Sequence, residues 1–142
     1  MQLQIHERKT DGIVILDLRG SLVIGESEAF LRETIRSFAN AGSLNVILNC
    51  AELNEIDEDG LGFLVGCSAR LRKEGGALKL LNLCRDHLDL VVLARLEGTF
   101  DVFTDEISAV NSFFPERIAP SFDVLEYARR QRTEYTARHT NT

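Results

Sequence analysis

The stretch from Val46 to Leu64 constrains the fold of this chain more than any other. It opens with the apolar run Val46 to Leu48, which follows the breaker Gly42 and is too short for a helix, so it predicts a buried strand. An acidic turn comes next, and apolar residues then recur with helical spacing from Leu61 onward. A strand, a loop and the start of a helix therefore follow one another closely.

The acidic turn also predicts how this helix begins. We expect Asp59 to be its N-cap, because a carboxylate at that position accepts hydrogen bonds from the free backbone N–H groups of the first turn. Negative charge is favourable at the positive end of the helix dipole. Helix starts that open onto solvent are common functional sites, so this segment is the first candidate site.

Apolar periodicity and chain breakers predict the other elements. The turn Thr10-Asp11-Gly12 should join two antiparallel strands, the second of which ends at Gly20. The strands before and after the helix that follows the acidic turn should be parallel, as in a βαβ unit. The expected strands cover residues 2–7, 13–19, 44–49, 77–83 and 100–103, and the expected helices cover residues 26–41, 60–74, 86–94, 105–113 and a short segment from about 122.

Each of the first three expected helices has an apolar face that should be buried. Phe63 and Cys67 lie on a second face of the helix after the acidic turn, where they are either exposed or packed under a neighbouring helix. Thr104 should cap the helix at 105–113. The residues expected in the core are Phe30, Leu31, Ile35, Phe38, Leu61, Leu64, Val65, Ser68, Leu71, Leu88, Val91 and Val92.

Length and composition favour one domain with a tail. A chain of 142 residues with 44% hydrophobic residues can build one core, and the composition changes after Phe114. We expect a domain at residues 1–113 and a C-terminal extension at 114–142 that is partly helical or disordered and dispensable for the core fold. The net charge of −6 argues against nucleic-acid binding and favours a basic partner surface.

The cysteines and the N-terminus predict a cytoplasmic protein. Cys50, Cys67 and Cys84 are odd in number and widely spaced, as reduced thiols are, and they form no metal-ligand pattern. The first residues lack the basic and apolar regions of a signal peptide. No apolar run has the length that a membrane span requires.

The acidic segment and the residues around it resemble a known family. Residues 56–62 read Ile-Asp-Glu-Asp-Gly-Leu-Gly, and they are followed by Phe-Leu-Val-Gly and a basic helix end at 70–73. This string after an apolar strand resembles the STAS family of anti-anti-sigma factors, also called anti-sigma factor antagonists, and the likeness extends from about Leu3 to Ser112. The resemblance implies an α/β domain of STAS type, with a mixed sheet of four to five strands and helices mainly on one face.

The motif departs from the family pattern at one informative place. In the family it reads Asp-Ser-Ser-Gly-Leu-Gly or similar, and a partner kinase phosphorylates the serine or threonine immediately before the first glycine. That position is Asp59 here, and Glu58 precedes it, so neither hydroxyl is present. We therefore expect no phosphorylation at the usual position. Asp59 either makes the protein a constitutive binder or keeps it permanently inactive.

The carboxylates of the acidic segment could instead hold a metal ion. Glu52, Glu55, Asp57, Glu58 and Asp59 are hard oxygen ligands. A calcium loop that began at Asp57 would need a glutamate at its twelfth position, where the sequence has Ser68. A receiver-like phosphoaspartate would need an acidic pair after an early strand, which is missing. A solvated loop with a helix cap is the simpler interpretation, and we expect neither a metal nor a cofactor.

No pattern of catalytic residues supports an enzyme. His6, His87 and His139 are far apart in the chain, and the sequence contains neither a nucleophile elbow nor a phosphate-binding loop. His87, near the start of a predicted helix, is expected at the surface or in an interface. The prediction is a non-enzymatic protein.

A protein-binding surface is the remaining interpretation. The loop before the first helix is unusually apolar, and the resemblance implies that it joins the acidic motif as the contact for an anti-sigma factor or a histidine-kinase-like ATPase in a partner-switching pathway. A homodimer is also possible, and a ligand-sensing or scaffold module without a sigma-factor connection is the alternative function. The expected partner-binding residues are Leu22, Val23, Ile24, Gly25, Asp57, Glu58, Asp59, Gly60, Leu61, Gly62 and Phe63.

Overall fold

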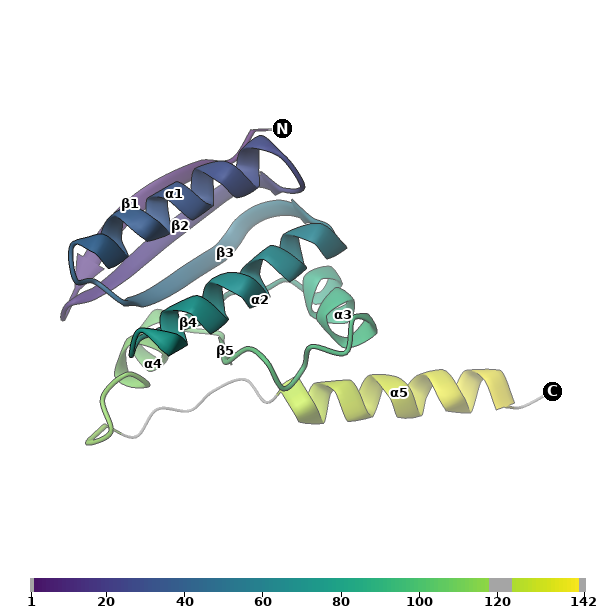
Figure 1. The fold of residues 1–142 in the computed structure, drawn as a ribbon. Helices are drawn as coiled ribbons and strands as arrows, with labels where there is room; N and C mark the ends of the chain where they lie inside the picture. Colours follow the sequence, from purple (N-terminus) through teal and green to yellow (C-terminus); the bar gives the residue numbers. More distant parts are fainter. Residues whose placement is uncertain (1, 118–123, 141–142) are drawn as a thin grey trace.

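A five-stranded sheet with helices packed against it forms the body of the computed structural model, which describes residues 2–117 and 124–140 (Figure 1). The strands are β1 (Gln4–Thr10), β2 (Ile13–Leu22), β3 (Asn45–Ile56), β4 (Ala77–Leu81) and β5 (Val102–Phe103). The helices are α1 (Glu26–Asn40), α2 (Glu58–Lys73), α3 (Arg85–Leu93), α4 (Glu106–Asn111) and α5 (Val124–Thr140).

The sheet is mixed, as the sequence predicts, and its strands follow the order β1-β2-β3-β4-β5. β1 and β2 form the predicted antiparallel hairpin around Asp11 and Gly12, which both have the positive φ that a tight hairpin turn requires. β3 is parallel to β2 and to β4, and β5 is parallel to β4. The helices α1 and α2 are the crossovers that allow the parallel pairs to form.

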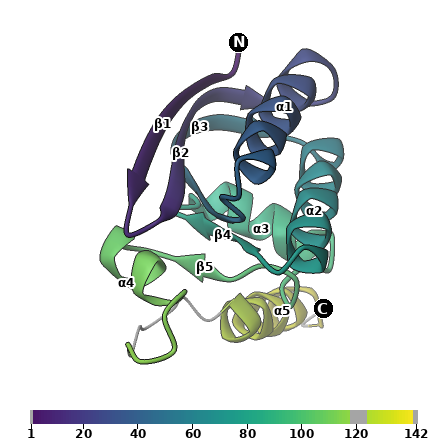
Figure 2. The same ribbon diagram turned by 60° about the vertical axis from the view of Figure 1, so that its left-hand side comes forward.

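Helices cover the two faces of the sheet unequally (Figure 2). Alternate residues of a strand point to opposite faces, so Val14 and Leu16 of β2 pack into the larger core with α1, α2 and α3. Ile13 and Ile15 point to the other face and pack with Val110 of α4 in a smaller cluster. The prediction of helices mainly on one face is confirmed.

Two strands are longer than the sequence predicts. β2 continues past Gly20 to Leu22, and β3 continues to Ile56 through the acidic segment, where the sequence predicts a turn. The pairing of these extensions is irregular, with two register shifts opposite residues 17–21. Such bulges break the alternation of buried and exposed residues, so the extensions have no period-two signal in the sequence.

Smaller corrections concern the elements after α2. α4 is capped by Asp105, whose side chain accepts a hydrogen bond from a backbone N–H, and not by Thr104; it ends at Asn111. β4 ends at Leu81, and β5 comprises only Val102–Phe103. Each expected element is present, and the differences lie at the element ends, where local patterns are weakest.

The predicted core is largely confirmed. Phe30 is the exception, because 48% of its surface is exposed. Phe38 and Val65 are half-buried and pack against the larger core. The predicted core residues that are buried are Leu31, Ile35, Leu61, Leu64, Ser68, Leu71, Leu88, Val91 and Val92.

The C-terminal helix α5 packs against α3. Val124 and Ala128 are buried with 5% and 1% of their surfaces exposed, and Val124 belongs to the larger core. Tyr127 donates a hydrogen bond to Asp89 of α3, and Arg132 pairs with Glu97. The expected short helix is therefore a helix of 17 residues with its own contacts to the body. Phe122, where the sequence predicts its start, lies outside the described residues.

A polar network ties α4 to the sheet on the less covered face. Arg8 of β1 donates hydrogen bonds to both oxygens of Asp17 at 2.7 and 2.8 Å, and it also bonds Glu106 of α4 at 2.7 Å. Asn49 of β3 donates to the same aspartate at 2.8 Å. The guanidinium of Arg8 holds the pKa of Asp17 below its usual value.

Candidate functional site

The two segments of the predicted partner surface lie side by side. Leu22, the last residue of β2, pairs with Ile56, the last residue of β3, so the loop at 23–25 leaves the sheet next to the start of α2. The approach is close: a Cβ on Gly60 would lie 2.4 Å from the backbone oxygen of Leu22. Only glycine fits at this position, so Gly60 allows the helix start to meet the loop.

Asp57 caps α2, and this finding corrects the prediction that Asp59 does so. Asp57 is extended, and its Oδ1 accepts a 2.7 Å hydrogen bond from the backbone N–H of Gly60. The physical reason lies in β3, whose ladder with β2 reaches Ile56 and leaves Asp57 as the first residue that is free to cap. Asp59 lies in the first turn and is exposed.

The predicted partner-binding residues divide by exposure. Exposed residues are Ile24, Gly25, Glu58, Asp59 and Gly62, and half-buried residues are Val23, Asp57 and Phe63. Leu22 and Leu61 have 0% and 2% of their surfaces exposed, and Gly60 is also buried. These three buried residues hold the two segments in place, and a direct contact with a partner stays a prediction for them.

Phe30 extends this surface, although the sequence pattern assigns it to the core. It is 48% exposed, Ile24 is 67% exposed, and both line a hollow of about 540 Å³ together with Val23 and Ser27. The hydroxyl of Ser27 donates to the backbone oxygen of Val23 and accepts from its N–H, which holds the loop against α1. The sequence signal for this hollow is the apolar loop that precedes α1. Exposed apolar residues that cluster together are typical of interaction sites.

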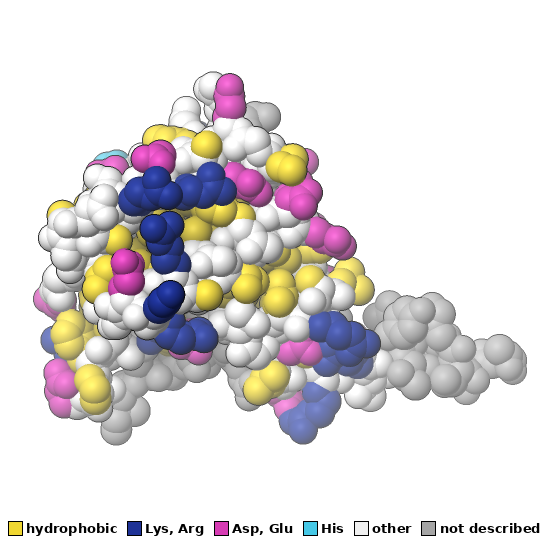
Figure 3. All heavy atoms as spheres, viewed as in Figure 1, with side chains coloured by type: hydrophobic (Ala, Val, Ile, Leu, Met, Phe, Trp, Pro, Cys, Tyr) yellow, Lys and Arg dark blue, Asp and Glu magenta, His cyan; other side chains and the backbone are white. Residues whose placement is uncertain are grey.

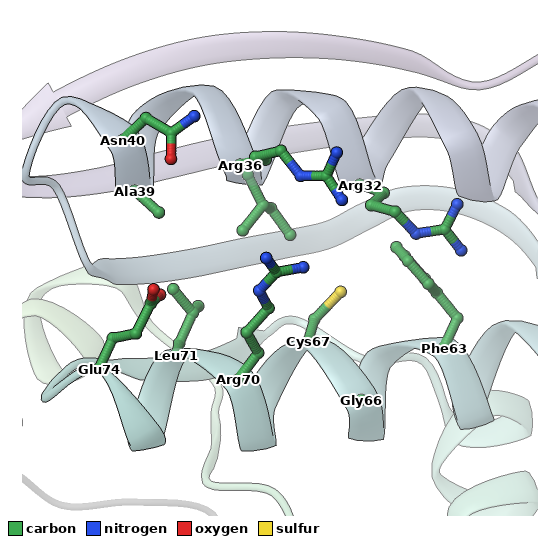
Figure 4. A pocket seen from close by; sticks show the side chains of 11 residues that line it. Arg32, Arg36, Ala39, Asn40, Phe63, Gly66, Cys67, Arg70, Leu71 and Glu74 are labelled. Atoms are coloured by element: carbon green, nitrogen blue, oxygen red, sulfur yellow. The ribbon is translucent and has the colours of Figure 1, made fainter.

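Phe63 and Cys67 are half-buried on the side of α2 that faces α1 (Figure 4). The guanidinium of Arg32 lies 5.1 Å from the centre of the Phe63 ring, a cation–π contact. Burial raises the pKa of the Cys67 thiol to about 11, and the positive charges of Arg32 and Arg70 act in the opposite direction. Packing beside the neighbouring helix, one of the two alternatives for this pair, is therefore what the structure shows.

His87 is buried, and the expectation of a surface or interface position is wrong. Only 6% of its surface is exposed, and it bonds the backbone of Asn54 in β3. Burial lowers the pKa of the imidazole, and Nδ1 has no partner among the described residues. His87 therefore connects the first turn of α3 to the C-terminal part of β3.

The described residues contain neither a cluster of metal ligands nor a membrane-spanning helix. In residues 2–117 and 124–140, no three histidine, cysteine or acidic side chains are grouped so that they could hold a metal ion. No helix in the described part of the chain is both long enough and apolar enough to cross a membrane.

Comparison with known proteins gives consistent matches over the sheet and its helices. The model of the family described as STAS domain matches residues 4–109. Over 103 residues, the chain is 26% identical to the anti-sigma-B factor antagonist of Bacillus subtilis strain 168, and the match covers 72% of this chain and 92% of the relative.

Solved structures match the same region. A putative anti-sigma factor antagonist from Thermotoga maritima superposes with a TM-score of 0.70 at 20% identity, over 76% of this chain and 92% of that chain. The Bacillus cell fate determinant SpoIIAA in its phosphorylated form matches with a TM-score of 0.59 at 21% identity, over 78% and 98% of the two chains. These structures confirm the expected fold.

Proposed function

Because this chain belongs to the STAS domain family, we propose that it is a non-enzymatic regulatory protein that binds an anti-sigma factor or a histidine-kinase-like ATPase in a partner-switching pathway. The relative from Bacillus subtilis, an anti-sigma-B factor antagonist, supports the regulatory class. The alternative is a ligand-sensing or scaffold module, and co-purification of a kinase-like ATPase from native cells would distinguish the two.

One observation carries the proposal: the loop at 23–25 and the start of α2 form a single surface. Gly60 allows the two segments to meet, and Asp57 fixes the first turn of the helix. The exposed residues of the two segments are Ile24 in the loop and Glu58 and Asp59 in the first turn of α2, and Phe30 lines a hollow on the loop side. An apolar patch beside fixed charges suits a protein partner, since the apolar contacts supply affinity and the charges supply specificity.

Asp59 carries a permanent charge at the position where the family has its phosphoacceptor. A phosphate would add about −1.5 to −2 charges at neutral pH, and a carboxylate supplies only one. We propose that a lysine or an arginine of the partner forms an ion pair with this single charge, so that binding is constitutive. The exposed position of Asp59 in the first turn of α2 is compatible with such a contact.

Substitution of Asp59 by serine tests this proposal. Asp59→Ser keeps the Asp57 cap and should fold normally. If the partner pairs a cation with Asp59, the substitution should weaken binding by about 1.5–3 kcal/mol, or roughly 10- to 150-fold in Kd. Titration of the purified partner at low and high salt measures the change, and the wild-type complex should be the more sensitive to salt.

Asp86→Ser is the matched control, because Asp86 occupies the same exposed position in the first turn of α3. It should change the Kd by less than about twofold, since only the general field of the protein is altered. Tighter binding by Asp59→Ser would mean that Asp59 mimics a repelling phosphate. Unchanged binding at both salt concentrations would place the interface elsewhere.

The proposal also includes the absence of phosphorylation at the motif. Residues 58 and 59 carry no hydroxyl, and Ser68 of α2 is buried with 3% of its surface exposed. After incubation with ATP and candidate partner kinases, the intact mass should be unchanged. A stoichiometric phosphate that maps between Asn54 and Gly66 would contradict this part of the proposal.

A further inference from the structure

A groove of about 310 Å³ runs between α1 and α2 (Figure 4). Arg32 and Arg36 line it from α1, and Arg70 lines it from α2. The three side chains extend into the space between the helices, and Cys67 and Phe63 lie beside them. We refer to this space as the α1–α2 groove.

The groove is basic on a protein whose net charge is −6. Lysine and arginine side chains gather over α1 and α2 on this face of the molecule (Figure 3). Glu74 is the only acidic residue that lines the groove, and Arg36 bonds the neighbouring Glu33 at 3.3 Å. Within the described residues, Arg32 and Arg70 form no ion pair. Neither guanidinium group therefore has a carboxylate partner, although that of Arg32 contacts the Phe63 ring.

Apart from the arginines, Asn40 and Glu74, the side chains that line the groove are apolar. Ile35 and Leu71 form its floor, with 6% and 2% of their surfaces exposed, and Phe63 and Cys67 form one wall. Around Cys67, burial has the largest effect and raises the pKa of the thiol, the positive charges of Arg32 and Arg70 lower it, and the charge of Glu28 raises it. An anion placed beside Cys67 would interact with the same two arginines.

Gly66 widens the groove. It lies in the interior of α2, where glycine destabilises a helix relative to alanine. A Cβ there would meet no atom within 4 Å, so packing within the chain does not require glycine. Gly66 lines the groove, and its missing side chain keeps this side of α2 open.

We propose that the α1–α2 groove binds a small organic anion, a carboxylate or phosphate ester with an apolar body of about the size of one aromatic ring. The arginines would hold the charged group, because guanidinium forms paired hydrogen bonds with planar or tetrahedral oxyanions. The apolar body would lie against Phe63 and Cys67. The volume is near the lower end of the range for small-molecule sites, which favours such a ligand over a protein segment. This inference does not depend on the proposed partner.

Titration of the full chain with phenyl phosphate, followed by ¹H–¹⁵N NMR, tests the inference. Saturable shifts should centre on the amides of Phe63, Gly66 and Cys67. Inorganic phosphate and phenol, which each supply one half of the probe, should bind at least about tenfold more weakly, because each makes only part of the contacts. Shifts that do not saturate, or that centre elsewhere, would overturn the inference. A tetraglutamate peptide that causes shifts when phenyl phosphate causes none would also overturn it.

Two variants and a matched control complete the experiment. Arg70→Gln should raise the Kd for phenyl phosphate about tenfold, the effect of one lost charge-assisted contact. Arg72→Gln removes the same charge from an exposed residue of α2 that does not line the groove, and it should change the Kd less than about twofold. Gly66→Leu should fill the groove and abolish binding without lowering the melting temperature. Equal effects at positions 70 and 72 would mean that only general charge attraction is measured and would overturn the site.

Discussion

At the scale of single residues, two glycines near the start of α2 should respond in opposite ways to alanine. A Cβ on Gly60 would approach the backbone oxygen of Leu22 to 2.4 Å, whereas one on Gly62 would meet no atom within 4 Å. We expect Gly60→Ala to destabilise the fold by about 1–3 kcal/mol, as overpacking does. Gly62→Ala should stabilise it by about 0.5–1 kcal/mol, because alanine is the better helix former.

Urea unfolding of both variants measures the two changes, and each serves as the control for the other. If Gly60→Ala leaves the stability unchanged, the contact between α2 and Leu22 is looser than the structure shows. If Gly62→Ala destabilises the protein, the start of α2 is not helical at that residue.

His87 should make the stability sensitive to mild acid. Burial lowers the pKa of its imidazole below the ordinary value of 6.5, although Asp86 and the bond to the backbone of Asn54 oppose the shift. The unfolded chain therefore binds the proton more readily than the folded one. The contribution of neutral His87 to stability is fully present above pH 6.5 and is lost as the pH falls toward its folded pKa.

Denaturant unfolding between pH 7.5 and pH 5 checks this sign. The wild-type free energy of unfolding should fall with the pH by up to about 1.4 kcal/mol per unit, the limit for one proton. His87→Gln keeps a hydrogen-bond donor without the titration, so its stability should change less over the same interval. If the free energy of unfolding depends on pH equally in the two proteins, His87 is not the source of the pH dependence.

The capping residue of α2 shows what local sequence can and cannot predict. Asp57 and Asp59 are both good caps by residue type, and a local pattern does not choose between them. The pairing of Leu22 with Ile56 makes the choice, because it keeps the chain extended up to Asp57. The motif was thus located from the sequence, but its orientation depends on a contact with a strand far away in the chain.

At the scale of elements, the docking of α5 should contribute to stability. Val124 is 5% exposed, whereas its neighbour Leu125 is 63% exposed. We expect Val124→Ala to lower the free energy of unfolding by about 1–2.5 kcal/mol. Leu125→Ala is the matched control and should change it by less than about 0.5 kcal/mol. Thermal or urea unfolding measures both, and equal effects would show that α5 does not dock as described.

This docking bears on the expected boundary after residue 113. The sequence predicts that the extension is dispensable for the core fold, and unfolding of a chain truncated after Phe114 tests this prediction. The contacts of Val124 with the larger core argue for a loss of stability on truncation. They were hard to foresee because α5 is mostly polar, and its few apolar residues pack against α3, an element distant in sequence.

At the scale of the whole molecule, the fold was predictable because several local signals agreed. The apolar runs of β2, β3 and β4 and the breakers between them all indicate a mixed sheet with crossover helices. The candidate site was predictable in part, since both of its segments were located from the sequence. The convergence of Arg32 and Arg70 was not predictable, because it depends on how α1 and α2 lie together.

The extension of β3 has a consequence for the solubility of the chain. Pairing with β4 ends at Asn49, so the rest of β3 has a neighbouring strand on one side only. His87 of α3 bonds the backbone at Asn54 in this stretch. Strand edges without a full set of partners are templates on which a second molecule can add its own strand, and charged side chains oppose such aggregation. Glu52 and Glu55 are exposed on this overhang. Their carboxylates repel one another when two copies approach, so the acidic run opposes intermolecular β-sheet growth along this part of β3.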